Sequence, residues 1–145
     1  MQTVIGSDHG GYELKQAIVE SLIAEGYQVL DLGVHSPESA DYPDIAALVA
    51  RAVAAGEAQR GILICGTGIG VSMAANKVRG VRAALCTDCY MARMAREHND
   101  AQILCLGGRV LGIGSALDIV QVFLESEFQG GRHARRVKKI NALEQ

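Results

Sequence analysis

Apolar and polar positions along the chain fall into two alternating patterns. Short apolar runs, typical of buried strands, are each followed by a longer stretch with apolar residues three or four positions apart, typical of helices. The predicted strands cover 3–6, 28–32, 62–64, 82–86 and 102–106. The predicted helices cover 12–25, a segment that opens at Pro43, 71–76, 87–98, 116–128 and 132–143.

Strands that are each followed by a helix indicate a parallel sheet with right-handed crossovers and helices on both faces. We therefore expect an α/β fold, a three-layer α/β/α Rossmann-like sandwich around a five-stranded parallel sheet. At 145 residues the chain is expected to form one domain over 1–145. Gly26 is expected to stop the first helix and Ser115 to cap the fifth.

Composition narrows the functional classes. The net charge of −2 argues against a nucleic-acid partner, which requires a basic surface. No apolar run approaches membrane-spanning length, and a strand-like segment already begins at Thr3, so neither a membrane partner nor a signal peptide is expected. Three of the four cysteines lie in apolar strand-like runs, which favours a reducing, cytoplasmic location over a disulfide framework.

The stretch 61–76, GILICGTGIGVSMAAN, concentrates the candidate chemistry. A buried strand is expected to end at Cys65, a glycine-rich loop follows, and a helix then begins. Glycines let backbone amides approach a ligand, and a helix start stabilises an anion. A thiolate is favoured in the same place. Cys65 is thus a candidate nucleophile or base, although most free cysteines are inert core residues.

The same loop resembles a dinucleotide-binding fingerprint only in part. Its spacing is Gly66-x-Gly68-x-Gly70, and Val71 stands where the third glycine of that motif belongs. Asp88, about 20 residues further on, has the spacing of the acidic residue that binds a ribose. A nucleotide-binding module therefore remains an alternative.

Two histidines adjoin predicted element ends. Asp8 and His9 follow the first strand, at the same end of a parallel sheet as Cys65, where Asp8 either caps the next helix or contacts a ligand. His98 and Asn99 end the fourth helix, where a C-cap is the more ordinary role because asparagine tolerates the left-handed conformation.

Two further motifs have mainly structural readings. The single Cys86-x-x-Cys89 motif lacks a second half-site for zinc and is taken as structural. The basic run after Gly131 usually means a solvated helix face. Arg132 and Arg136, however, are one helical turn apart, and two guanidinium groups on one face suit a phosphate.

Several blocks together resemble the type B ribose-5-phosphate isomerase family, within the ribose/galactose isomerase superfamily. The resemblance runs over essentially the whole chain. The blocks are GSDHGGYELK at 6–15, DYPD at 41–44, ILICGTGIGVSMAANKVRGVRAALC at 62–86, REHNDAQILCLGGRV at 96–110 and GGRHARRV at 130–137.

This resemblance implies interconversion of ribose 5-phosphate and ribulose 5-phosphate through an enediolate, in the pentose phosphate pathway. Cys65 matches the base that moves a proton between C1 and C2, and Thr67 the residue that assists it. His98 matches the residue that opens the furanose ring. The remaining implied contacts are the anion hole of Gly66, Gly68 and Gly70, the hydroxyl contacts Asp8 and Asn99, and the phosphate contacts His9, Arg109, Arg132 and Arg136.

Sister branches can be compared with the sequence. One branch uses a glutamate base where this chain has Val71, so the base falls to Cys65. The galactose 6-phosphate branch lacks the histidine of REHN and the GGRHxxR ending, and this chain has both. Allose 6-phosphate or galactose 6-phosphate remains an alternative substrate.

No set of His, Cys, Asp and Glu has metal-ligand spacing, so neither a metal nor another cofactor is expected.

Topology predicts the assembly. In a parallel sheet Cys65 and His98 should lie at opposite ends of their own subunit, because His98 ends a helix that runs back from the fourth strand. If both act on one sugar phosphate, His98 must come from a partner chain. We expect a homodimer with shared active sites, or a dimer of such dimers, with the helix at 132–143 packed on the partner.

Overall fold

The computed structural model describes residues 1–144 and contains one five-stranded sheet. All strand pairs are parallel, and the order across the sheet is β2-β1-β3-β5-β4. The strands are β1 Gln2–Ser7, β2 Gln28–Asp31, β3 Arg60–Cys65, β4 Ala83–Leu85 and β5 Ile103–Gly107. The predicted parallel sheet is confirmed, with β3 at its centre.

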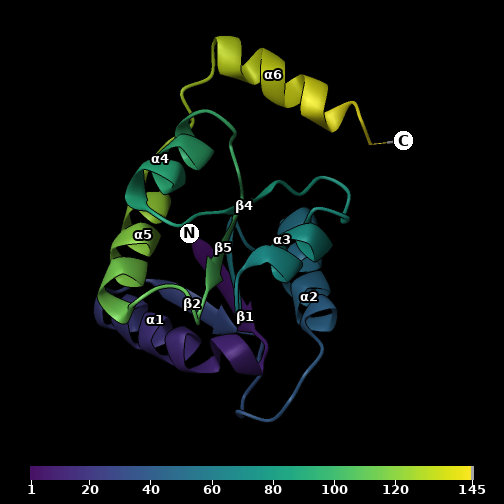
Figure 1. Ribbon diagram of the computed structural model, residues 1–145. Helices are drawn as coiled ribbons and strands as arrows, with labels where there is room; N and C mark the ends of the chain where they lie inside the picture. Colours follow the sequence, from purple (N-terminus) through teal and green to yellow (C-terminus); the bar gives the residue numbers. More distant parts are fainter. Residues whose placement is uncertain (145) are drawn as a thin grey trace.

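Helices cover both faces of this sheet (Figure 1). The α1, α4 and α5 helices pack on one face, and α2 and α3 pack on the other. Their bounds, with the short 3-10 helix η1, are η1 His9–Gly11, α1 Tyr12–Ala24, α2 Tyr42–Ala54, α3 Ile69–Ala75, α4 Cys89–Glu97, α5 Ile113–Glu125 and α6 Arg132–Asn141. This is the expected three-layer α/β/α sandwich.

The central strands are buried on both faces, which explains their continuous apolar runs. Along β3, Ile62 and Ile64 point into the core beneath α1 and α5, whereas Leu63 and Cys65 point into the core beneath α2 and α3. Successive side chains of a strand alternate between the two faces of the sheet. Cys65 is therefore directed toward the α2–α3 side.

Two details of the helix ends differ from the prediction. Ser115 lies in the first turn of α5 rather than at its cap, because the extended Gly112 precedes the first helical residue, Ile113. Glycine is an acceptable cap and needs no side-chain hydrogen bond. At the end of α4, the residue with a positive φ is Asp100, at 47°, and not Asn99.

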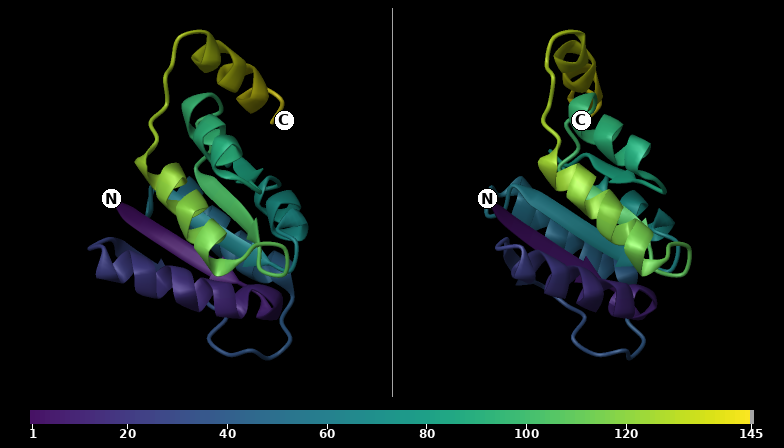
Figure 2. Two further views of the ribbon diagram at one scale, coloured as in Figure 1. Left: turned by 60° about the vertical axis from the view of Figure 1, so that its left-hand side comes forward. Right: turned by 90° about the vertical axis from the view of Figure 1, so that its left-hand side faces the viewer.

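The last helix lies apart from both helical layers. Figure 2 shows α6 beyond one end of the sheet in both views, connected by the segment that follows α5. That segment is attached to the end of α4, where the Gln129 N–H donates to the carbonyl of Glu97 at 3.0 Å. Among the helices of residues 1–144, none has both the length and the apolar content needed to cross a bilayer.

Candidate active site

Cys65 is the last residue of β3 and opens into a tight turn before α3. Its side chain is buried, and its Sγ accepts a hydrogen bond from the Gly68 N–H at 3.1 Å. Gly68 has a φ of 82°, and a Cβ there would lie 2.6 Å from Leu85 Cδ1. Only glycine fits this turn, which brings a backbone donor onto the sulfur. The sulfur is thus held in place at the edge of the glycine-rich loop.

Three loops meet at this end of the sheet. The N–H of Asp8 donates to the carbonyl of Ile64 at 3.2 Å, which attaches the loop after β1 to β3. The Gly108 N–H donates to the Cys65 carbonyl at 2.8 Å, and the Arg109 N–H to the Gly66 carbonyl at 2.9 Å. The loops after β1, β3 and β5 are thus fixed around Cys65 by backbone hydrogen bonds.

The loops after β1 and β3, with the starts of α2 and α3, border a pocket of about 390 Å³ on the α2–α3 side of the sheet. Its walls bring together a thiol, a carboxylate, a hydroxyl and glycine backbone. The lining residues are Asp8, Tyr42, Cys65, Gly66, Thr67, Ile69, Gly70 and Met73. A groove of about 410 Å³ between β2 and α2 holds none of the predicted site residues. The pocket beside Cys65 is therefore the candidate active site.

Asp8 caps the next helix, and it also lines the Cys65 pocket. Its Oδ1 accepts hydrogen bonds from the N–H groups of Gly10 at 2.9 Å and Gly11 at 3.2 Å, which caps η1. The same side chain lines the pocket beside Cys65. Capping fixes one carboxylate oxygen and leaves the other to face a ligand.

The start of α3 supplies polar groups beside the thiol. Thr67 Oγ1 accepts the Ile69 N–H at 3.1 Å, so its hydroxyl proton can point elsewhere. The first four N–H groups of a helix have no carbonyl partner within it. Gly68 and Ile69 use theirs on Cys65 and Thr67, and the N–H groups of Gly70 and Val71 belong to the same first turn.

His9 and Arg109 line a neighbouring pocket of about 260 Å³. The Ala40 N–H donates to His9 Nδ1 at 3.1 Å, so a neutral His9 carries its proton on Nε2. Arg109 lies close to the glycine loop, because a Cβ built on Gly66 would be 3.3 Å from Arg109 Nη1. Two donors suited to a phosphate thus adjoin the Cys65 pocket.

The other four predicted site residues lie at the opposite end of the sheet. His98 is the C-cap of α4, and its ring stacks on His133 of α6 with centroids 4.0 Å apart. The Asn99 carbonyl accepts a hydrogen bond from Arg82, which immediately precedes β4. Arg132 and Arg136 are exposed on α6.

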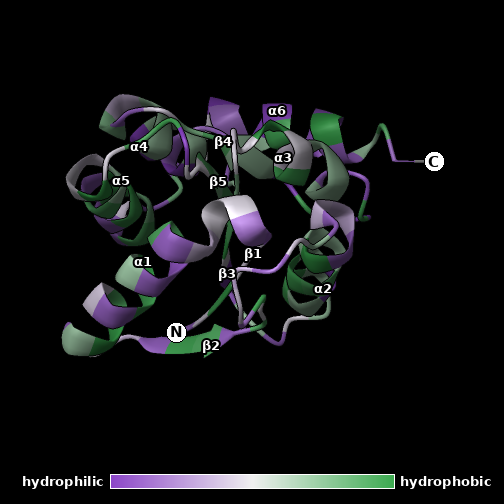
Figure 3. Ribbon diagram, turned by 60° about the horizontal axis from the view of Figure 1, so that its bottom comes forward, coloured by the Kyte–Doolittle hydropathy of each residue, from purple (hydrophilic) through white to green (hydrophobic). Residues whose placement is uncertain are grey.

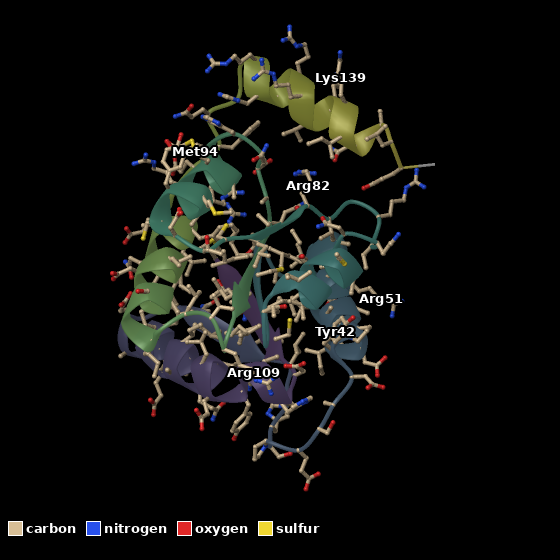
Figure 4. The ribbon with its side chains drawn as sticks, in the orientation of Figure 1. Tyr42, Arg51, Arg82, Met94, Arg109 and Lys139 are labelled. Atoms are coloured by element: carbon tan, nitrogen blue, oxygen red, sulfur yellow. The ribbon has the colours of Figure 1, made fainter. Side chains whose placement is uncertain are left out.

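The chain therefore does not bring its predicted site residues together. Cys65 pairs with Gly107 at the end of β5, whereas His98 and Asn99 adjoin the start of that strand. Five strand residues separate the two ends by about 16 Å. Figure 4 shows the same division, with Arg109 on the side of η1 and Arg82 beneath α6.

Three residues near these two groups were not predicted as site residues from the sequence. Tyr42 lines the Cys65 pocket, and a Cβ on Gly70 would lie 2.5 Å from its ring, so Gly70 is required for the tyrosine to fit. The sequence feature that could have pointed to Tyr42 was the DYPD block at 41–44. His133 and Arg82 contact the end of α4 and stood within the quoted blocks. Nothing in their spacing indicated those contacts.

Two of the other cysteines, Cys86 and Cys105, have strongly raised pKa values. The pKa of Cys86 is raised to about 12, first by burial and then by Asp88. Burial also raises the pKa of Cys105 far above its ordinary value. Both are therefore thiols at neutral pH, and all four cysteines are unpaired. The structure thus supports the structural reading of the Cys86-x-x-Cys89 motif.

Asp88 has a capping role. Its side chain accepts the Met91 N–H at 2.8 Å and thereby caps α4. One of its carboxylate oxygens is thus bound to the start of the helix. Within residues 1–144, no group of three or more His, Cys, Asp and Glu side chains is arranged to hold a metal ion.

Comparison with known proteins identifies the family. The profile of the family described as Ribose/Galactose Isomerase matches residues 3–140. Ribose-5-phosphate isomerase B of Escherichia coli is 49% identical over 140 residues, which are 97% of this chain and 94% of that protein.

Solved structures agree with this match. Ribose-5-phosphate isomerase B of Clostridium thermocellum superposes with a TM-score of 0.98 at 62% identity, covering 99% of this chain and 97% of the other. The enzyme of Mycoplasma genitalium with bound ribulose 5-phosphate gives a TM-score of 0.94 at 46% identity, covering 99% and 95%. The chain therefore belongs to the ribose/galactose isomerase family and, within it, to the type B ribose-5-phosphate isomerases.

Proposed function

We propose that the chain interconverts ribose 5-phosphate and ribulose 5-phosphate, with Cys65 as the base. One observation carries this proposal: the Cys65 sulfur lies at the end of the central strand, beside a pocket of about 390 Å³, and accepts a backbone N–H at 3.1 Å. Moving a proton next to a carbonyl requires a base and a stabilised oxyanion. Both are supplied within one turn of chain.

The chemistry follows from the placement of these groups. The Cys65 thiolate removes the C2 proton of the open-chain aldose, and the electrons of that C–H bond form a C1–C2 double bond with negative charge on O1. The N–H groups of Gly66, Gly70 and Val71 stabilise that charge, while the Gly68 N–H holds the Cys65 sulfur. The resulting thiol returns the proton to C1, and Thr67 helps move the O2 proton to O1 as the ketone forms at C2.

The remaining roles need a second subunit. Asp8 holds substrate hydroxyls, and His9 and Arg109 contact the substrate from the Cys65 side. His98 opens the furanose ring, Asn99 contacts a hydroxyl, and Arg132 and Arg136 bind phosphate, all from the partner. Because the length of β5, about 16 Å, separates the two groups within one chain, a two-fold dimer is the simplest way to unite them.

The surface around the Cys65 pocket supports a covering partner. Ile69 and Met73, both on the pocket wall, are 47% and 65% exposed. Exposed apolar side chains around a pocket are typical of interaction sites. The α6 helix offers a complementary surface, since hydrophobic residues interrupt its basic ones (Figure 3). We propose that α6 packs on the partner, as a dimer or a dimer of dimers.

The pentose phosphate is the favoured substrate. The three relatives named above are all ribose-5-phosphate isomerases, and one holds ribulose 5-phosphate. The six-carbon phosphates are not favoured by these matches. The nucleotide-binding module is not favoured by them either. The proposal includes no cofactor and a cytoplasmic location, which suits four unpaired cysteines.

The test is a coupled assay of ketose formation from ribose 5-phosphate, allose 6-phosphate and galactose 6-phosphate, before and after exhaustive chelation. We expect turnover of ribose 5-phosphate to exceed that of both six-carbon sugars and to survive chelation. Absence of ketose formation from ribose 5-phosphate would refute the proposed function. Loss on chelation, with recovery on adding a divalent ion, would refute the metal-independent mechanism alone.

A further inference from the structure

Arg82 links three backbone segments at the end of the sheet away from Cys65. Its Nε donates to the Asn99 carbonyl at 3.1 Å, and its Nη2 donates to the Asp100 carbonyl at 2.9 Å. Its Nη1 donates to Asn141 Oδ1 on α6 at 2.9 Å. The side chain is only 14% exposed and lies directly beneath α6 (Figure 4). The guanidinium thus joins the start of β4, the turn after α4 and α6.

This turn needs an external partner to keep its shape. The Asn99 and Asp100 carbonyls lie beyond the end of α4, and both accept hydrogen bonds from Arg82. Asp100 has a φ of 47°, which is unfavourable for a residue other than glycine. A planar guanidinium can bind two such carbonyls at once with fixed geometry, which the single ammonium of a lysine cannot do.

A second arginine holds the other side of the same turn. Arg96 is buried, and its Nη1 donates to Asp100 Oδ1 at 2.9 Å and to the Ala101 carbonyl at 2.7 Å. Arg96 reaches the segment before α6 only through the Ser126 carbonyl at 3.4 Å. Arg82 is therefore the arginine that connects the turn to α6 itself.

We propose that Arg82 is a positioning residue of the half-site that the chain presents to its partner. It sets the spacing between the turn, which carries His98 and Asn99, and α6, which carries Arg132 and Arg136. This proposal rests on the proposed function, because those four residues act on substrate only in the shared site. Without Arg82, the ring-opening histidine and the phosphate-binding helix are no longer held in one arrangement.

The chain offers matched variants. Arg82→Ala removes the hydrogen bonds to the turn and to α6, whereas Asn141→Ala removes only the one to α6. Arg82→Lys keeps the positive charge but lacks the planar guanidinium with its several donors. Arg79→Ala is the control, because this arginine of the same loop is 74% exposed and makes only a 4.0 Å ion pair with Glu144. The measurements are kcat and KM for ribose 5-phosphate, the NMR titration of His133, and the melting temperature.

We expect Arg82→Ala to lower kcat about 10- to 100-fold, because a misplacement near 1 Å can cost that much. Its KM should rise about tenfold, and the lowered pKa of His133 should move toward its ordinary value as the stack loosens. Asn141→Ala should mainly raise KM, and Arg82→Lys should recover only part of the loss. Arg79→Ala should match the wild type.

Folded Arg82→Ala protein with wild-type kcat, KM and His133 titration would overturn the proposal and leave Arg82 a purely structural residue. If Arg82→Ala does not fold, Asn141→Ala decides: unchanged KM and His133 titration overturn the proposal. Failure of the proposed function would appear separately, as a wild-type protein without turnover, and the His133 titrations would still report on the Arg82 link.

Discussion

His98 and His133 stack ring on ring, with centroids 4.0 Å apart and an angle of 11° between the ring planes. The contact joins the end of α4 to the first turn of α6. Burial lowers the pKa of His133, and His98, Arg132 and Arg136 lower it further. The neutral imidazole is thus the form that suits the folded protein.

This stack should weaken on acidification. A depressed pKa stabilises the fold above the unfolded value, about 6.5 for histidine, and that contribution is lost as pH falls through the folded value. We expect α6 to loosen from α4 below about pH 6.5. In an NMR titration, His98→Ala should raise the pKa of His133, because it removes both a covering ring and a cationic neighbour. A His133 that titrates at its ordinary value in the wild type would contradict this account.

Cys65→Ala should abolish isomerisation while leaving sugar-phosphate binding largely intact. Loss of the base should lower kcat by at least about 10²- to 10⁴-fold, the usual contribution of general acid–base catalysis. Calorimetry with ribose 5-phosphate measures the binding.

The matched control for that variant is Cys105→Ala. Burial raises the pKa of Cys105, so this residue stays a protonated thiol at neutral pH. Activity per folded molecule should be unchanged in this control. Near-normal turnover by Cys65→Ala would remove Cys65 as the base.

Arg132→Ala and Arg136→Ala should raise KM for ribose 5-phosphate far more than Arg135→Ala. A hydrogen bond to a charged group contributes about 1.5–3 kcal/mol, so each loss should weaken binding about 10- to 150-fold. All three arginines are exposed on α6, which makes Arg135 a fair control for charge and folding. Equal, small effects at all three positions would indicate a solvated basic face instead of a phosphate site.

Lys15 and Asp31 provide a test of the fold. The Lys15 side chain is fully buried, and its Nζ lies 2.6 Å from Asp31 Oδ2. Asp31→Asn leaves a buried ammonium without its carboxylate and should cost about 3 kcal/mol in the free energy of unfolding. Lys15→Met replaces the ammonium with an apolar group of similar length and should cost clearly less. Denaturant melts measure both, and a larger loss for Lys15→Met would contradict this view of the pair.

The sequence was most informative where local periodicity and burial coincide. Apolar runs at 62–64 and 102–106 predicted central strands, because such strands are covered on both faces. Helix ends were less predictable. Gly112 competes with Ser115 as a cap, and tertiary hydrogen bonds from Arg96 and Arg82 place the positive φ at Asp100.

The candidate site was predictable only where its residues are close in sequence. Cys65, Thr67 and the glycines form one turn, so their motif specified a common place. Tyr42, by contrast, reaches the Cys65 pocket from the start of α2. The rest of α2 and all of β3 lie between Tyr42 and Cys65 in the sequence. The contacts of Arg82 and His133 depend on where the long segment before α6 leads, which no local pattern encodes.

The central claim is that one active site takes Cys65 from one chain and His98 from another. The direct measurement mixes inactive Cys65→Ala and His98→Ala subunits, refolds them together from a partly unfolded state, and assays ring-form ribose 5-phosphate. A mixed dimer would have one site with both residues and one with neither, so activity should reappear, approaching a quarter of the wild-type level for random pairing of equal amounts. If mixed dimers form, as native mass spectrometry would detect, and remain inactive, Cys65 and His98 do not share a site across the interface.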